Sequence, residues 1–129
     1  MFTVTKNGRP VHLNLFQIKL PVPGIMSILH RVSGVLLSVA VPVGLYLLDL
    51  SLRSPEGYAQ ARFLLDHWLA ALLLLGLFWG LLHHLFAGLR HLLLDVDVGI
   101  EKPAYRRSAW AVLLAAPPLA LLLTWGVLA

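Results

Sequence analysis

Three histidines and an arginine stand together at the end of a long, almost wholly apolar run. The stretch HHLFAGLRH contains His83, His84, Arg90 and His91. A neutral imidazole is the commonest metal ligand among side chains and binds through either ring nitrogen. On a helix, His84 and His91 share nearly one face, whereas His83 points about 100° away. This spacing is suited to ligating a metal or contacting a polar ligand.

Small residues follow His84 at helical spacing. Ala87 and Gly88 lie three and four positions later, so we expect little side-chain bulk one turn beyond this histidine. A flat macrocycle needs such a bare patch, and His84 could then reach its iron through one nitrogen. At about 1.5 Å per residue, His84 lies roughly 9 Å inside the charge boundary at Arg90. A single histidine there is more often a packing or interfacial residue, the interpretation kept for His83 and His91.

A second polar group occurs earlier, in the stretch SILHR. Ser27 and Arg31 are four residues apart and His30 follows Ser27 by three, so the three share a helix face. The hydroxyl suits a quinone-type oxygen, and the cations suit carboxylates such as haem propionates or a carbonyl-bearing ligand. The alternative is that Arg31 is only a topology signal or a snorkelling cation.

The elements that must position these residues are membrane helices. Of the 129 residues, 59% are hydrophobic and 12% are charged, and the mean hydropathy is +0.82. Residues 68–89 and 108–129 carry no Asp, Glu, Lys or Arg, and each can span a bilayer. Residues 32–48 lengthen to a span if residues 27–31 form the first turns. We therefore predict an all-α membrane protein with three transmembrane helices.

The proline and glycine positions predict the boundaries. Pro21, Pro23 and Gly24 disfavour a helix before Ile25. The sequence at residues 54–57 predicts a turn. The predicted organisation is a cytoplasmic N-terminal segment at residues 1–24 and a transmembrane domain at 25–129, with helices at about 25–52, 61–94 and 104–128.

Composition excludes several classes of function. The chain has no cysteine, so it forms no disulfide and supplies no thiolate to an iron–sulfur cluster. The first 20 residues lack the continuous apolar core of a secretory signal peptide. The net charge of +4 comes from residues flanking apolar spans, which favours an orienting role over nucleic-acid binding. The positive-inside rule puts the N-terminus in the cytoplasm and the C-terminus outside.

The helices themselves indicate a partner. Small residues at Ser27, Gly34 and Ser38 allow close helix packing. Pro117 and Pro118, within the last helix, free backbone carbonyls that neighbouring helices or water must satisfy. Three helices are few for an independent membrane machine, so we expect a subunit of a larger complex.

Three motifs, in order, resemble a known family. SILHRVSG at residues 27–34, SPEGY at 54–58 and HLFAGLRHLLLD at 84–95 closely resemble the larger cytochrome b membrane-anchor subunit of succinate dehydrogenase, respiratory complex II. Arg9-Pro10 also fits the family's opening. The resemblance covers roughly residues 9–107, whereas the last helix is similar only in hydrophobicity and its double proline departs from the pattern.

The resemblance implies a set of partners and ligands. The chain would form half of a heterodimeric helical bundle with a second, smaller membrane-anchor subunit, and one haem b would lie between them. His84 matches one axial iron ligand, and the other ligand belongs to the partner. His30 and Arg31 match residues near the haem propionates. Ser27 and Arg31 match the ubiquinone site facing the iron–sulfur subunit, and Asp95 matches an acidic residue on a possible proton path.

The implied activity is reduction of ubiquinone. Electrons would come from iron–sulfur clusters in a partner, and originate at a flavoprotein subunit that oxidises succinate to fumarate. The implied location is the bacterial inner membrane, in contact with lipid. One alternative is the anchor of a quinol:fumarate reductase, and another is a structural anchor without haem. A transporter or channel subunit is less favoured, because it would carry polar residues along the middle of a helix.

Overall fold

The computed structural model describes residues 19–129, and this part of the chain forms four helices and no strand. They are α1 (Val22–Arg53), α2 (Pro55–Leu65), α3 (Trp68–Asp95) and α4 (Lys102–Leu128). The helices α1, α3 and α4 are long and apolar enough to cross a membrane. The prediction of an all-helical membrane protein with three spans is thus confirmed. Most of the predicted N-terminal segment, residues 1–18, lies outside the described residues.

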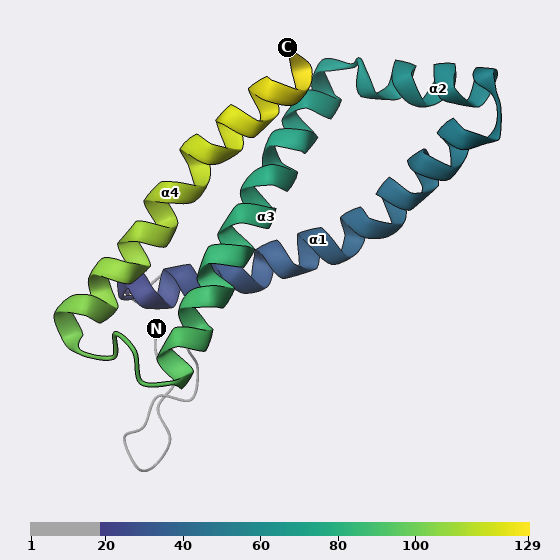
Figure 1. Ribbon diagram of the computed structural model, residues 1–129. Coiled ribbons are helices and arrows are strands. Elements are labelled where there is room, and N and C mark those ends of the chain that lie inside the picture. The colour runs from purple at the N-terminus through teal and green to yellow at the C-terminus, as the bar shows by residue number, and fades with distance from the viewer. Residues whose placement is uncertain (1–18) are drawn as a thin grey trace, which may run out of the picture.

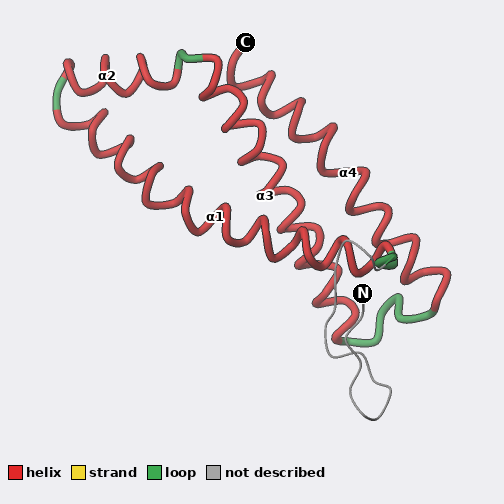
Figure 2. Tube along the Cα trace, turned by 180° about the vertical axis from the view of Figure 1, so that it is seen from behind, coloured by secondary structure: helices red, strands yellow, loops and turns green. Residues whose placement is uncertain are grey.

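The three long helices converge at one end. Figures 1 and 2 show α3 and α4 side by side, while α1 crosses α3 and then diverges from it. The helix α2 bridges the gap at the far end. The start of α1, the end of α3 and the start of α4 therefore meet, and we call this region the N-terminal end of the bundle. The histidines of the predicted site lie there.

The first helix begins three residues earlier than the sequence predicted. Pro23 lies in the first turn of α1 and does not precede the helix. A proline is tolerated there because the first backbone N–H groups of a helix have no intrahelical partner. The Pro21 carbonyl accepts the bond from Gly24 N at 2.8 Å and so opens the first turn.

The predicted helix at residues 61–94 is divided in two. The helix α2 begins where the Ser54 side chain accepts a bond from Gly57 N at 3.0 Å. The Glu56 carboxyl accepts bonds from the Glu56 backbone N–H and from the Ser54 hydroxyl, and these bonds hold its pKa below the ordinary value. The helix α3 begins again where the His67 side chain accepts from Leu69 N at 3.2 Å. The His67 cap begins a new helix directly after Asp66, which divides the predicted helix there. The Ser54 cap begins α2, so the predicted turn at 54–57 contains the start of a helix.

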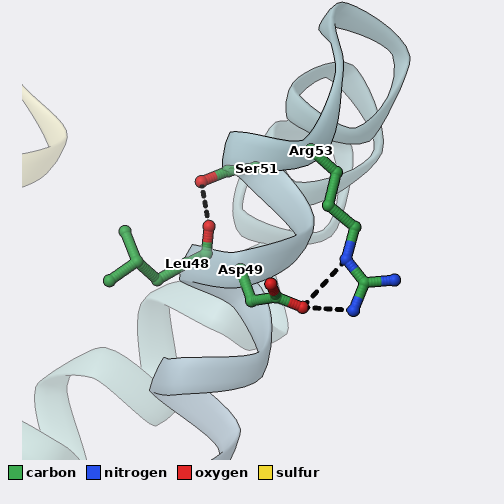
Figure 3. Close-up of polar contacts among 4 residues, drawn as sticks. All are labelled: Leu48, Asp49, Ser51 and Arg53. Carbon is green, nitrogen blue, oxygen red and sulfur yellow. Dashed lines mark hydrogen bonds and ion pairs between the residues drawn. The ribbon is translucent and has the colours of Figure 1, made fainter.

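Polar side chains form hydrogen bonds and an ion pair within the last turns of α1. The Arg53 guanidinium pairs with the Asp49 carboxylate, with Arg53 Nε 2.9 Å from Asp49 Oδ2. The Ser51 hydroxyl donates to the Leu48 carbonyl at 2.7 Å. Figure 3 shows these contacts on the last two turns of α1. An arginine in the last turn also complements the helix dipole.

The helix α4 continues through its two prolines. Pro117 and Pro118 are exposed, whereas the buried side of the helix is lined almost entirely by small residues. These buried residues are Ala109, Val112, Ala116, Ala120 and Thr124. Their spacing of three or four positions puts one stripe against α3. Of the small residues that the sequence singled out on α1, Gly34 lies against the His84 ring, whereas Ser38 is exposed.

Little of the apolar surface is buried within the chain. The core cluster contains Met26, Ala87, Ala109 and Val112, all from the N-terminal end of the bundle. In the most apolar window of α1, 0% of the residues are buried. Side chains so apolar and so exposed must face lipid or another protein.

A buried arginine fastens α3 to α4. Arg90 is 5% exposed, its Nε donates to Ser108 Oγ at 2.9 Å, and its Nη2 donates to the Tyr105 carbonyl at 2.9 Å. The guanidinium carbon also lies 4.5 Å from the centre of the Tyr105 ring. Within residues 19–129 no carboxylate pairs with Arg90. The hydroxyl, the carbonyl and the aromatic face therefore take the place of a counter-ion.

Replacing Arg90 with methionine should destabilise the protein while keeping the apolar stem. Each hydrogen bond to a charged group contributes about 1.5–3 kcal/mol, so losing two should lower the free energy of unfolding by about 3 kcal/mol or more. Thermal unfolding of the purified protein in detergent measures this as a lower midpoint. Arg107→Met, at an exposed position of α4, is the matched control. Equal midpoints for the two variants would contradict the fastening role.

Candidate functional site

The His84 ring is held against α1 by its backbone. His84 Nδ1 lies 3.1 Å from the His30 carbonyl oxygen and 3.4 Å from Ser33 Oγ. Because a carbonyl oxygen only accepts, the first contact puts the proton on Nδ1. In a neutral imidazole this leaves a lone pair on Nε2, which has no hydrogen-bond partner among residues 19–129. His84 is thus prepared to bind a metal through Nε2.

Glycines let the two helices approach at this point. A Cβ added to Gly34 of α1 would lie 3.0 Å from His84 Cε1. A Cβ added to Gly88 of α3 would lie 3.4 Å from His30 Nε2. Both contacts are close, so the imidazole rings lie where side chains are absent. The glycine in SILHRVSG therefore has a specific neighbour, the His84 ring.

The bare patch predicted beside His84 has a different occupant. Ala87 is 0% exposed and packs in the core with Met26, and Gly88 faces the His30 ring. The sequence predicted that these small residues would leave room for a flat macrocycle. In the structure α1 covers this patch, with the His30 ring against Gly88 and Met26 against Ala87.

Three imidazole rings follow one another across the contact. The His30 and His84 rings are stacked, with centres 4.2 Å apart and planes at 12°. The His91 ring is tilted on the other side, 5.2 Å from His30. From the sequence we expected His91 to be a packing or interfacial residue, but in the structure its ring lies beside the His30 ring, which stacks on the His84 ring. The seven-residue spacing from His84 was the signal for this shared face.

A hollow of about 840 Å³ opens beside this cluster. Its polar lining comes from Ser27, His91, Lys102, Tyr105 and Arg106, and residues 20–24 complete it. A hydroxyl, an imidazole and two cations line one polar space, which suits a ligand with carbonyl or anionic oxygens. The contribution of α4 was not predicted, because its residues are far in sequence from Ser27.

Two predicted residues stay outside this hollow. Arg31 and Asp95 are exposed, and neither lines the hollow with Ser27. Arg31 follows Ser27 by one turn of α1, and Asp95 is the last residue of α3. His30 stacks on His84, and Ser27 lies in the hollow with His91. Within the described chain, neither Arg31 nor Asp95 shares these contacts.

His83 is more buried than the sequence indicated. It is 0% exposed, its Nε2 lies 3.4 Å from the Met26 carbonyl, and its ring stacks on Trp79 at 5.4 Å. Its Nδ1 is buried without a hydrogen-bond partner among residues 19–129. These contacts make His83 a packing residue between α1 and α3.

The described residues do not form a complete metal site by themselves. No three His, Asp or Glu side chains within residues 19–129 gather to hold a metal ion. A metal bound by His84 would therefore take further ligands from a cofactor or a partner.

Comparison with known proteins identifies the family. The model for the succinate dehydrogenase/fumarate reductase transmembrane subunit matches residues 5–123. The succinate dehydrogenase cytochrome b556 subunit of Paracoccus denitrificans is 33% identical over 95% of this chain and 94% of its own length. The protein of the same name from Coxiella burnetii is 39% identical over 81% of this chain and 84% of its own. The chain belongs to the cytochrome b membrane-anchor subunits of the succinate dehydrogenase/fumarate reductase family.

Proposed function

We propose that this chain is the larger membrane anchor of a succinate:ubiquinone oxidoreductase. It binds one haem b jointly with a second, smaller anchor subunit and forms part of the site where ubiquinone is reduced. The observation that carries the proposal is the meeting of Ser27, His30 and His84 at one end of the bundle in a chain of this family. The relatives' name, cytochrome b556 subunit, supports the haem.

The residues around His84 fit a haem. Nδ1 is engaged by the His30 carbonyl and Nε2 is unpartnered within the described chain, which suits an axial imidazole ligand. The second axial ligand would come from the smaller anchor subunit. His30 and Arg31 would meet the propionates. When bound, a haem held by two imidazoles has no open position and supplies electron transfer instead of oxygen binding.

The Ser27 hollow suits the quinone head group. Reduction takes two electrons and two protons, and negative charge develops on the quinone oxygens. The Ser27 hydroxyl can donate to one such oxygen, and nearby cations stabilise the charge in a site that partners shield from water. Arg31, exposed one turn later, would complete the site where the iron–sulfur subunit covers it. Asp95 would pass protons towards the site.

The exposed apolar helices suit the proposed partners. The membrane half of the complex would be the two anchor subunits in lipid, and α1, whose apolar window is unburied, offers them a face. The N-terminal end of the bundle would face the cytoplasm, and the iron–sulfur and flavoprotein subunits would bind on that side. The C-terminus would then be periplasmic, across the bacterial inner membrane. The net charge of +4 would orient the chain in the membrane, so we expect no nucleic-acid partner.

Purification of the tagged chain from its native membrane tests the proposal. The expected result is a complex that contains a flavoprotein, an iron–sulfur protein and a smaller anchor, and that reduces ubiquinone with succinate. Two outcomes separate the alternatives. Faster fumarate reduction by quinol than quinone reduction by succinate would favour a fumarate reductase, which the family description also covers. A complex with no haem would favour a structural anchor.

Gly34→Ala should perturb the haem site specifically. Its new Cβ would stand 3.0 Å from His84 Cε1, so the ring must shift by a few tenths of an ångström. We expect an altered haem spectrum and lower haem content in the purified complex. Gly44→Ala, on the same helix with nothing within 4 Å of its added Cβ, is the control. Identical haem spectra in the two variants would show that Gly34 does not contact the ligand.

A further inference from the structure

Ser33 is a fully buried polar residue with no role in the proposed electron transfer. It is 0% exposed, and its neighbours lie on α1 and α3. The backbone of α3 comes close at this level, since a Cβ added to Gly80 would lie 3.9 Å from Ser33 Cβ. The Ser33 hydroxyl therefore has to find its hydrogen-bond partners within the protein.

The Ser33 hydroxyl has its proton directed away from His84. Ser33 Oγ donates to the His30 carbonyl at 2.8 Å. Since a hydroxyl has one proton, the oxygen presents only lone pairs to His84 Nδ1, 3.4 Å away. The same His30 carbonyl accepts from His84 Nδ1 at 3.1 Å. Both oxygens beside Nδ1 are therefore acceptors.

We propose that Ser33 is a positioning residue for the haem ligand. Together with the His30 carbonyl, its hydroxyl holds the His84 ring in the orientation and tautomer that direct the Nε2 lone pair towards the iron. This inference rests on the proposed haem site and adds a residue outside it. Partners of this kind fix the ring and raise the basicity of the ligand, and their loss commonly weakens metal binding by about tenfold or more.

Ser33→Ala in the purified complex tests the inference. Because the His30 carbonyl remains, we expect the lower end of that range, with haem passing to excess apomyoglobin about tenfold faster than from the unaltered complex. The haem midpoint potential should rise, because a less basic imidazole stabilises ferric iron less. Ser38→Ala is the matched control, since Ser38 also bonds the α1 backbone, at Gly34 O, but contacts no histidine.

A second variant guards against an effect of volume alone. Ser33→Cys fills similar space but is a weak donor and acceptor, so its haem should also be lost faster. Haem loss and potential equal to the unaltered complex in either variant would overturn the inference. Failure of both variants to assemble, while Ser38→Ala assembles, would also overturn it by assigning Ser33 to folding. If the unaltered complex holds no haem, the proposed function itself fails.

Discussion

His84→Leu should remove the b-type haem from the complex. His84 is the histidine whose Nδ1 is fixed by a backbone carbonyl and whose Nε2 is unpartnered within the described chain. Leucine fills similar space but cannot bind iron, so one of the two proposed axial ligands is lost. The reduced-minus-oxidised absorption spectrum of the purified complex measures the effect. We expect most of the α-band to be lost, because loss of a hydrogen-bond partner of a ligand already weakens metal binding by about tenfold or more, and loss of the ligand itself should cost more.

The matched variant is His91→Leu. His91 shares the face of His84 and lies 5.2 Å from the His30 ring, but it also lines the hollow. Its haem content should stay near that of the unaltered complex, although the band position can shift through His30. Haem kept in His84→Leu and lost in His91→Leu would show that the wrong histidine was chosen.

Ser27→Ala and Arg31→Leu should each sharply slow succinate-dependent quinone reduction. Each variant removes a donor or cation proposed to meet charge on the quinone oxygen, and losing such a group typically lowers kcat by about 100-fold or more. The haem should stay bound in both variants, because His84 and its contacts with Ser33 and the His30 carbonyl are unaltered. Arg31→Leu also removes a proposed partner of the propionates, so its band position can shift slightly. The assay follows ubiquinone reduction by succinate in the purified complex.

The controls for these two variants lie at the far end of α1. Ser51→Ala and Arg53→Leu remove the same side-chain types from residues that bond only within the last turns of the helix. Their quinone kinetics should match the unaltered complex. Near-normal kinetics in both Ser27→Ala and Arg31→Leu would contradict the site assignment. If quinone reduction is slow only in Ser27→Ala, the quinone site is confined to the hollow, which Ser27 lines and Arg31 does not.

The three membrane spans could be predicted well because hydropathy largely determines them, whereas α2 was not predicted as a separate helix. Charge-free apolar runs of about 20 residues leave few alternatives to a membrane helix. The ends of the helices were harder, because local bonds decide them. Pro23 belongs to the first turn of α1, and Asp66 and His67 divide the long predicted helix where capping bonds begin α3. Propensity and periodicity do not register such caps until the backbone is known.

The site could be predicted only within each helix. The spacing in SILHR and HHLFAGLRH put Ser27, His30 and His84 at the same depth, and the structure brings these three to one end. Contacts between helices were beyond the pattern. Ala87 and Gly88 lie against α1, and residues of α4 line the hollow. Both contacts depend on how the helices cross, which the spacing within one helix does not show.

A difference absorption spectrum of the purified native complex tests the proposed haem site most directly. It is recorded before and after succinate is added, with dithionite giving full reduction. Electrons from succinate should reach a haem held by His84, so the proposed function predicts a b-type α-band with dithionite that appears at least partly with succinate. A spectrum in which dithionite reveals no b-type haem would contradict it and would return His84 to a packing role.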